Sequence, residues 1–106
     1  MGSYLNTVYD RDNSTIMGYY RSGIIYGSDN QRAKGYYRNG IIYDSDNRTA
    51  VGYYRNGIVF GRDNHRAVGY FRRGMILDSH NQAIVGYYAG WGQGGGAAAL
   101  LLIFEQ

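Results

Sequence analysis

The sequence predicts an all-β protein in which copies of a 17-residue unit form short antiparallel three-stranded meanders arranged in a closed, flower-like ring. Three observations support this prediction. Glycine and asparagine each recur every 17 residues along most of the chain. Each unit has apolar runs of strand length, separated by residues typical of tight turns. Incomplete units at the two ends of the 106-residue chain add up to one whole unit. A short fixed period indicates ringed or stacked copies of one supersecondary unit.

The repeat defines the units and the extent of the repeat domain. Complete units cover residues 18–34, 35–51, 52–68 and 69–85, a first unit at 1–17 lacks its opening strand, and a partial unit at 86–89 keeps only that strand. The predicted organisation is therefore a β-repeat domain at 1–89, a Gly-rich linker at 90–96 and an apolar C-terminal tail at 97–106.

The first element of each unit is a hairpin with a tight turn. In the unit at 35–51, Asn39-Gly40 separates two apolar runs, and Asn-Gly is the strongest short-range hairpin signal because a type I′ turn needs positive φ at both central residues. Arg73 takes the place of Asn39 in a later unit and is expected to shift the turn type there. The predicted turn glycines are Gly23, Gly40, Gly57 and Gly74.

The second element is a loop that ends in a left-handed residue. Asp44 pairing with Arg48 would leave the three-residue loop 45–47, and such loops usually end in an αL residue, for which Asn is well suited. The predicted αL residues are Asn13, Asn30, Asn47, Asn64 and Asn81.

The glycine that opens each unit is predicted to kink the chain between one small sheet and the next, because Gly inside a strand often marks a bend or bulge. With residues 35–38 paired to 41–44, Tyr37 opposes Ile42 on one face. The alanine column that includes Ala50 points to this as the crowded inner side. The predicted kinks are Gly18, Gly35, Gly52, Gly69 and Gly86.

The two chain ends complement each other. Tyr87-Tyr88 can pair with residues 7–9 and close the ring, which removes exposed strand edges. The alternative is head-to-tail pairing between chains, which builds an open filament if the rotation does not close.

The tail is the second distinctive segment. Residues 97–104 are a run of eight apolar residues, much shorter than the about 20 that a membrane-spanning helix needs. The segment could return as a plug over an open end of the repeat domain, dock onto another subunit or a partner, or contact a membrane, with Leu100, Leu101, Leu102, Ile103 and Phe104 as the docking residues. Residues 1–10 have no basic start or apolar core, so no secretory signal is predicted and the compartment stays open.

No catalytic or metal chemistry is predicted. The Asp-x-Asp-Asn string resembles part of a calcium loop, but it lacks the third acid and distal Glu that an EF-hand adds. Nucleophile elbows, phosphate loops and dinucleotide fingerprints are absent from the sequence. The protein is therefore predicted to be non-enzymatic and to need no cofactor.

Tyrosine and arginine recur beside each other and are the candidate ligand or packing residues. They could pack on one another, form shallow pockets for glycans or cell-wall material, or bind single-stranded nucleic acid by stacking. The mild net charge of +3 does not demand a nucleic-acid partner. The residues are Tyr19, Tyr36, Tyr53, Tyr70, Arg21, Arg38, Arg55 and Arg72.

The string G-Y-Y-x-x-G-I-I-Y-D-x-D-N-x-x-A-V, followed by a Gly-rich stretch and an apolar run, resembles the small bacterial proteins called 4-fold beta-flower proteins. The resemblance covers residues 4–88 and implies a repetitive β-protein whose function is not established. A weaker likeness to aromatic choline- or cell-wall-binding repeats keeps glycan binding as a hypothesis, although those repeats commonly have GW where this chain has GYY.

The sequence therefore predicts a structural or interaction module that self-assembles as a homo-oligomer or head to tail, with a possible protein partner for the tail. Carbohydrate binding through repeated Tyr pockets is one alternative, and single-stranded nucleic-acid binding by the Tyr and Arg columns is the other.

Overall fold

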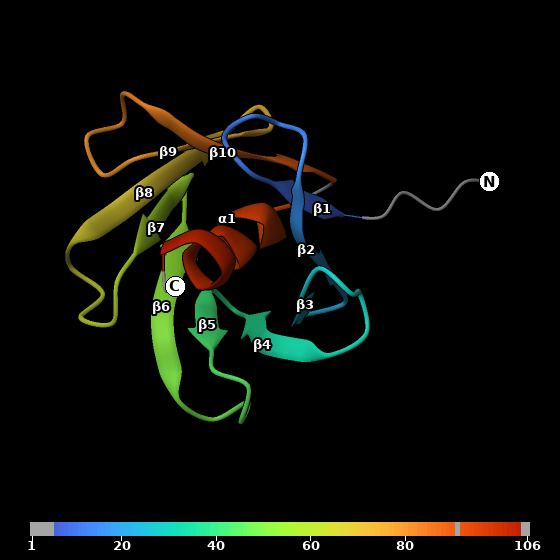
Figure 1. The fold of residues 1–106 in the computed structure, drawn as a ribbon. Helices are drawn as coiled ribbons and strands as arrows, with labels where there is room; N and C mark the ends of the chain where they lie inside the picture. The colour runs from blue at the N-terminus through green and yellow to red at the C-terminus, as the bar shows by residue number, and fades with distance from the viewer. Residues whose placement is uncertain (1–5, 91, 105–106) are drawn as a thin grey trace.

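Ten antiparallel strands close into one barrel in the computed structural model of the protein, which describes residues 6–90 and 92–104 (Figure 1). The strands are β1 (Thr7–Tyr9), β2 (Ile16–Arg21), β3 (Ile24–Tyr26), β4 (Ala33–Arg38), β5 (Ile41–Tyr43), β6 (Ala50–Arg55), β7 (Ile58–Phe60), β8 (Ala67–Arg72), β9 (Met75–Leu77) and β10 (Ile84–Ala89). A short α-helix, α1 (Gly94–Ala99), continues into a π-helical turn, η1 (Leu100–Phe104). The ends of the predicted first unit (1–5) and tail (105–106), and residue 91 of the predicted linker, lie outside the described residues.

The two chain ends meet in the sheet and close the ring. β1 pairs with β10 on one side, with Val8 opposite Tyr88, and with β2 on the other. Each of the ten strands is thus paired on both sides, and no strand edge is left open among the described residues. The prediction of an all-β closed ring of antiparallel repeats is confirmed, and the open filament is not the observed fold.

The joint between units differs from the expected kink between separate sheets. β6 runs unbroken from Ala50 through Gly52, so each unit contributes one long and one short strand. The register shifts at the joint, where Ile42 opposes Gly52 but Tyr43 opposes Ala50, so a β-bulge takes up one extra residue. A one-residue shift reverses the face that each side chain occupies. Tyr37 and Ile42 do face the core as predicted, but the prediction that the alanine column shares this inner face is wrong, and the glycine holds that position.

All four tight turns have the same geometry. Asn39 and Gly40 have φ of 55° and 81°, and Arg73 and Gly74 have φ of 51° and 83°. The expectation that Arg73 shifts the turn type is therefore wrong, because the turn forces this arginine into the left-handed region.

Relief of this strain gives a stability prediction. Arg73→Asn is expected to raise the free energy of unfolding by about 0.5 kcal/mol, because Asn tolerates positive φ better than Arg. Urea denaturation measures the change. The reciprocal substitution Asn39→Arg should lower stability by a similar amount, and a neutral result for both would contradict this explanation.

The second loop is wider than the predicted three residues. The backbone N–H of Asp44 donates to the carbonyl of Thr49 rather than pairing with Arg48, and Asn47 has φ of 60°. The Asp46 carboxylate accepts the backbone N–H groups of Arg48 and Thr49 at 2.9 and 3.0 Å, which braces the wider loop. All five loop asparagines have φ between 58° and 60°.

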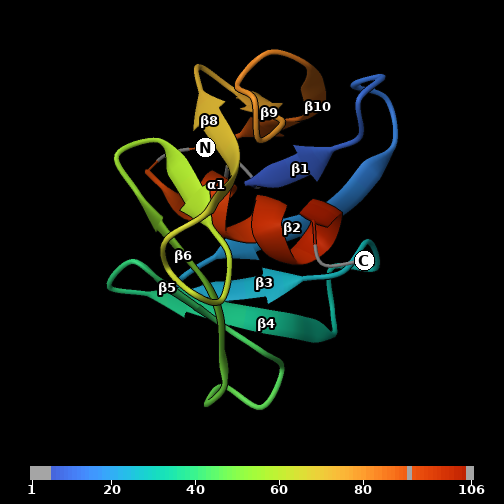
Figure 2. The same ribbon diagram turned by 90° about the vertical axis from the view of Figure 1, so that its left-hand side faces the viewer.

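The C-terminal segment fills the lumen of the barrel (Figures 1 and 2). The residues from Gly94 to Leu100 are all buried, and Leu102 is 7% exposed. Of the alternatives for the tail, the structure has the plug, so Leu100 and Leu102 are core residues and not free docking residues. Gly94–Gly96, expected in a flexible linker, instead form the start of α1.

The three glycines of α1 leave room for a ring of aromatic side chains. A Cβ on Gly94 would stand 2.7 Å from the Tyr20 ring, and Cβ atoms on Gly95 and Gly96 would overlap the rings of Tyr88 and Phe71. Neighbouring rings meet edge to face, as aromatic pairs prefer, with centroids 6.1–6.3 Å apart in the pairs Tyr20–Tyr37, Tyr37–Tyr54 and Phe71–Tyr88. A glycine helix surrounded by aromatic rings therefore forms one layer of the core.

The glycines predicted as kinks form the next layer, and each one faces a different residue of the tail. The facing pairs are Gly52–Leu100, Gly35–Leu101, Gly18–Leu102, Gly86–Ile103 and Gly69–Phe104. Each step along the tail thus moves one unit around the barrel. The i→i+5 hydrogen bonding of a π-helix places more residues in one turn than the 3.6 of an α-helix. The number of tail residues per turn is therefore closer to five, the number of units around the barrel.

Burial of the inner tyrosines predicts a loss of stability in alkali. Burial raises the pKa of Tyr20, Tyr37 and Tyr54 above the ordinary value. The unfolded chain therefore loses these protons first, so the stability they contribute is complete below about pH 10 and falls as the pH rises further.

Urea denaturation at increasing pH measures this loss. Tyr54→Phe should reduce the loss above about pH 10, and the phenylalanine already present at position 71 shows that the slot accepts this ring. An alkaline profile unchanged by the substitution would contradict the assignment.

Candidate binding sites

The predicted Tyr and Arg residues form repeated columns on the outer wall of the barrel. In the column of β4 and β5, Tyr36 lies opposite Tyr43, and the Arg38 guanidinium lies 4.0 Å from the centroid of the Tyr43 ring. The same guanidinium donates to Oδ1 of Asn47 at 2.5 Å. Each column therefore links a strand arginine to the left-handed asparagine of the following loop.

The arrangement repeats in the neighbouring columns. Arg21 lies over Tyr26 at 4.1 Å and Arg55 over Phe60 at 4.0 Å, and Arg21, Arg55 and Arg72 donate to Asn30, Asn64 and Asn81 at 2.6, 2.7 and 2.5 Å. Tyr19, Tyr36, Tyr53 and Tyr70 are half-buried beside them. The guanidinium groups of Arg21, Arg38 and Arg55 thus each cover one face of a neighbouring ring, a face on which a nucleic-acid base could otherwise stack. Sequence reasoning missed the pairing of Arg with Asn, although a constant spacing of nine residues signals it.

The loop carboxylates accept hydrogen bonds from backbone N–H groups of their own loops. Hydrogen bonds from the backbone N–H groups of Thr49 and Arg48 hold the pKa of Asp46 below its ordinary value. Asp29 and Asp63 have the pKa lowered for the same reason. Across residues 6–90 and 92–104, no group of three or more His, Cys, Asp or Glu side chains could hold a metal ion.

One column departs from the others and forms what we call the seam face, the outer surface of β10 and β1 with the start of β2. Ala89 ends β10 where the other long strands end in arginine. Ile84 and Ile16 begin β10 and β2 where β4, β6 and β8 begin with alanine, and both isoleucines are 37% exposed. Ile16 opposes Tyr9 of β1, which opposes Tyr87 on its other side, and Ile84 opposes Leu77 of β9 (β10, β1 and β2 lie side by side in Figure 1). The seam face is therefore the apolar side of the barrel.

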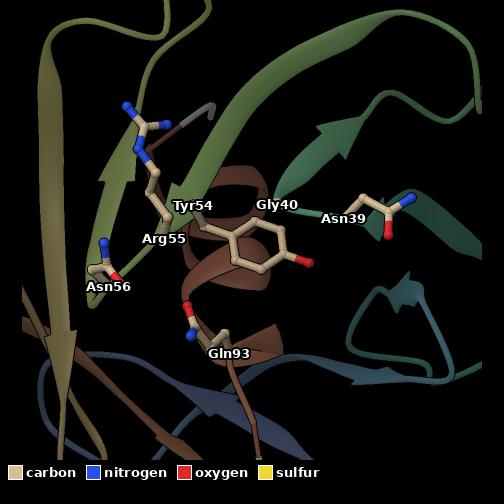
Figure 3. Close-up of a pocket in the computed structure, with 6 residues that line it drawn as sticks. All are labelled: Asn39, Gly40, Tyr54, Arg55, Asn56 and Gln93. Carbon is tan, nitrogen blue, oxygen red and sulfur yellow. The ribbon is translucent and has the colours of Figure 1, made fainter.

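A pocket of about 340 Å³ opens at the end of the barrel where the tight turns lie, and we call it the rim pocket. Its lining residues are Asn39, Gly40, Tyr54, Arg55, Asn56 and Gln93. Figure 3 shows the Tyr54 ring in the middle, with Asn39 and Asn56 on either side and Gln93 of the plug segment next to it. Sequence reasoning missed this site, because it joins two turns to a residue of the tail.

Comparison with family models, with curated proteins and with solved structures finds no match to this chain. The barrel has five quasi-equivalent units, with the split unit completed by β10 and β1, whereas the name of the beta-flower proteins states four. Within the described part of the chain, no helix is long and apolar enough to cross a membrane. The function must therefore be argued from the surfaces themselves.

Proposed function

We propose that the protein is a non-enzymatic interaction module that self-associates through the seam face. The observation that carries this proposal is the exposure of Ile16 and Ile84, which begin the two strands on either side of β1, together with the alanine that ends β10 in place of an arginine. Exposed apolar side chains grouped on one face mark an interaction site more often than isolated ones do.

Charge favours a second copy of the chain as the partner at this face. A twofold contact brings the same patch of both subunits together. At the other four columns this contact would place Arg21, Arg38, Arg55 or Arg72 against its own copy, and like charges in contact are unfavourable. The seam face, where Ala89 replaces the arginine, escapes this repulsion.

The barrel interior supports a binding role over a catalytic one. The plug fills the lumen, and the buried ionisable side chains facing it are tyrosines such as Tyr20, whose hydroxyl donates to the carbonyl of Ala89 at 2.9 Å. Closure of β1 on β10 also uses the complementary chain ends within one chain. Association is therefore proposed between outer faces and not between strand edges.

Sedimentation velocity over a wide range of protein concentration tests the proposal. The parent chain should form dimers as concentration rises, and Ile16→Lys with Ile84→Lys should remain monomeric. The matched control is Ala50→Lys with Ala67→Lys, which adds the same charge at the equivalent positions of β6 and β8 and should leave dimerisation unchanged. A parent chain that stays monomeric, or a control that dissociates equally, would refute the seam face as the contact.

A further inference from the structure

We infer that the rim pocket binds a neutral sugar unit, a role separate from the proposed self-association. The pocket volume of about 340 Å³ is at the small end of the range for ligand sites, about 300–1,000 Å³, and suits one or two sugar rings.

The lining groups match the hydrogen-bonding chemistry of a sugar. The side-chain amides of Asn39, Asn56 and Gln93 each offer both donors and an acceptor. Sugar hydroxyls also donate and accept, so either partner can satisfy the other around the ring. Tyr54 stands among these amides and adds an aromatic surface against which an apolar C–H face can pack (Figure 3).

The charges near the pocket favour an uncharged ligand. Arg55 lines the pocket, but its guanidinium turns to the outer wall, where it lies 4.0 Å from the Phe60 ring centroid and donates to Asn64 at 2.7 Å. Figure 3 shows this side chain leading away from Gln93 and the Tyr54 hydroxyl. The aspartates of the described chain all belong to the loops that follow the short strands, so none of the described carboxylates lines the pocket.

Departures from the repeat confine the site to one position on the rim. The four tight turns begin with Ser22, Asn39, Asn56 and Arg73, so one pair of neighbouring turns presents asparagine on both sides. Gln93 joins that same pair from the start of the plug, where its side chain makes no capping hydrogen bond to α1. Its amide is thus available to a ligand.

Amide chemical shifts recorded during titration test the inference. The probes are neutral trisaccharides of glucose, mannose and N-acetylglucosamine, with glucuronic acid as the charged comparison. At least one neutral sugar should give saturable shifts around Tyr54 and Gln93 that persist at high salt, since no ion pair is formed.

Variants that preserve the fold test the assignment to the rim pocket. Asn39→Gly and Asn56→Gly remove the amides and keep the positive φ of the turn, and each, like Gln93→Ala, should weaken binding about tenfold, within the range for a lost hydrogen bond. The matched control is Ser22→Gly in a turn outside the pocket, which should bind as the parent does. No saturable shift with any neutral sugar, binding of glucuronic acid alone that salt abolishes, or full affinity in all three pocket variants would overturn the inference. Ile84→Lys should retain sugar binding, which separates this result from that for the seam face.

Discussion

Gly52→Ala is expected to lower the free energy of unfolding by about 3 kcal/mol, the upper part of the range for overpacked cores. The added methyl group would overlap Leu100 Cδ2 and stand 3.0 Å from the carbonyl oxygen of Phe60. Leu100 is 1% exposed and belongs to the packed core, so it has little room to retreat. Ordinarily Ala in a strand is more stable than Gly by about 0.5–1 kcal/mol, so the clash reverses the usual sign.

Gly61→Ala is the matched control for this prediction. Gly61 follows β7, and a Cβ there would make an ordinary contact of 3.5 Å with Val68 Cγ1. Its stability should therefore stay within about 0.5 kcal/mol of the parent in urea denaturation. Equal losses at both positions would show that the clash in the lumen is not the cause.

The elements that were predictable from sequence are those set by local chemistry. Asn39-Gly40 and Asn47 indicate a left-handed backbone conformation by residue type alone, because few other residues tolerate positive φ. Ring closure was also predictable, since residues 7–9 and 86–89 are the missing halves of one unit.

The role of Gly52 and its equivalents was not predictable in the same way. Glycine in a strand signals either a bend or the close approach of another group, and these two readings share one sequence pattern. The approaching group is Leu100, about 50 residues away in the chain for the unit of Gly52, and no local pattern links the two. The helix at Gly94–Gly96 was not predictable for the same reason, because a run of glycines is typical of a flexible linker and also allows a helix to pack closely against aromatic rings.

The two candidate sites also differ in how far they can be predicted from the sequence. Ile16, Ile84 and Ala89 depart from the repeat at identifiable positions, so the seam face can be predicted from the sequence once the outer face of the strands is known. Which side chains of these strands face outward depends on the bulges beside Gly18 and Gly86, which the period-two rule alone does not place. The rim pocket needs Gln93 and Asn56 to line one cavity, and they do so because the plug begins at the turn end of the barrel.

Leu100→Ala is expected to cost about 3 kcal/mol, within the range for a buried leucine truncated to alanine. Leu100 is 1% exposed, and its loss would leave a cavity against Gly52. Urea denaturation of the single and double variants then measures the fit between the tail and the barrel.

The double variant Gly52→Ala with Leu100→Ala should be more stable than the sum of its single losses allows, by at least about 1 kcal/mol, because residues in contact couple. The new methyl group at position 52 enters the space that the leucine leaves. Gly18→Ala provides the matched comparison, since its Cβ would stand 2.6 Å from Leu102 and not from Leu100. Its loss should simply add to that of Leu100→Ala. If the losses for Gly52→Ala and Leu100→Ala simply add, or if Gly18→Ala couples to Leu100→Ala equally, the tail fills the barrel without a residue-by-residue match. Coupling at Gly52 alone would establish that each unit is fitted to its own residue of the tail.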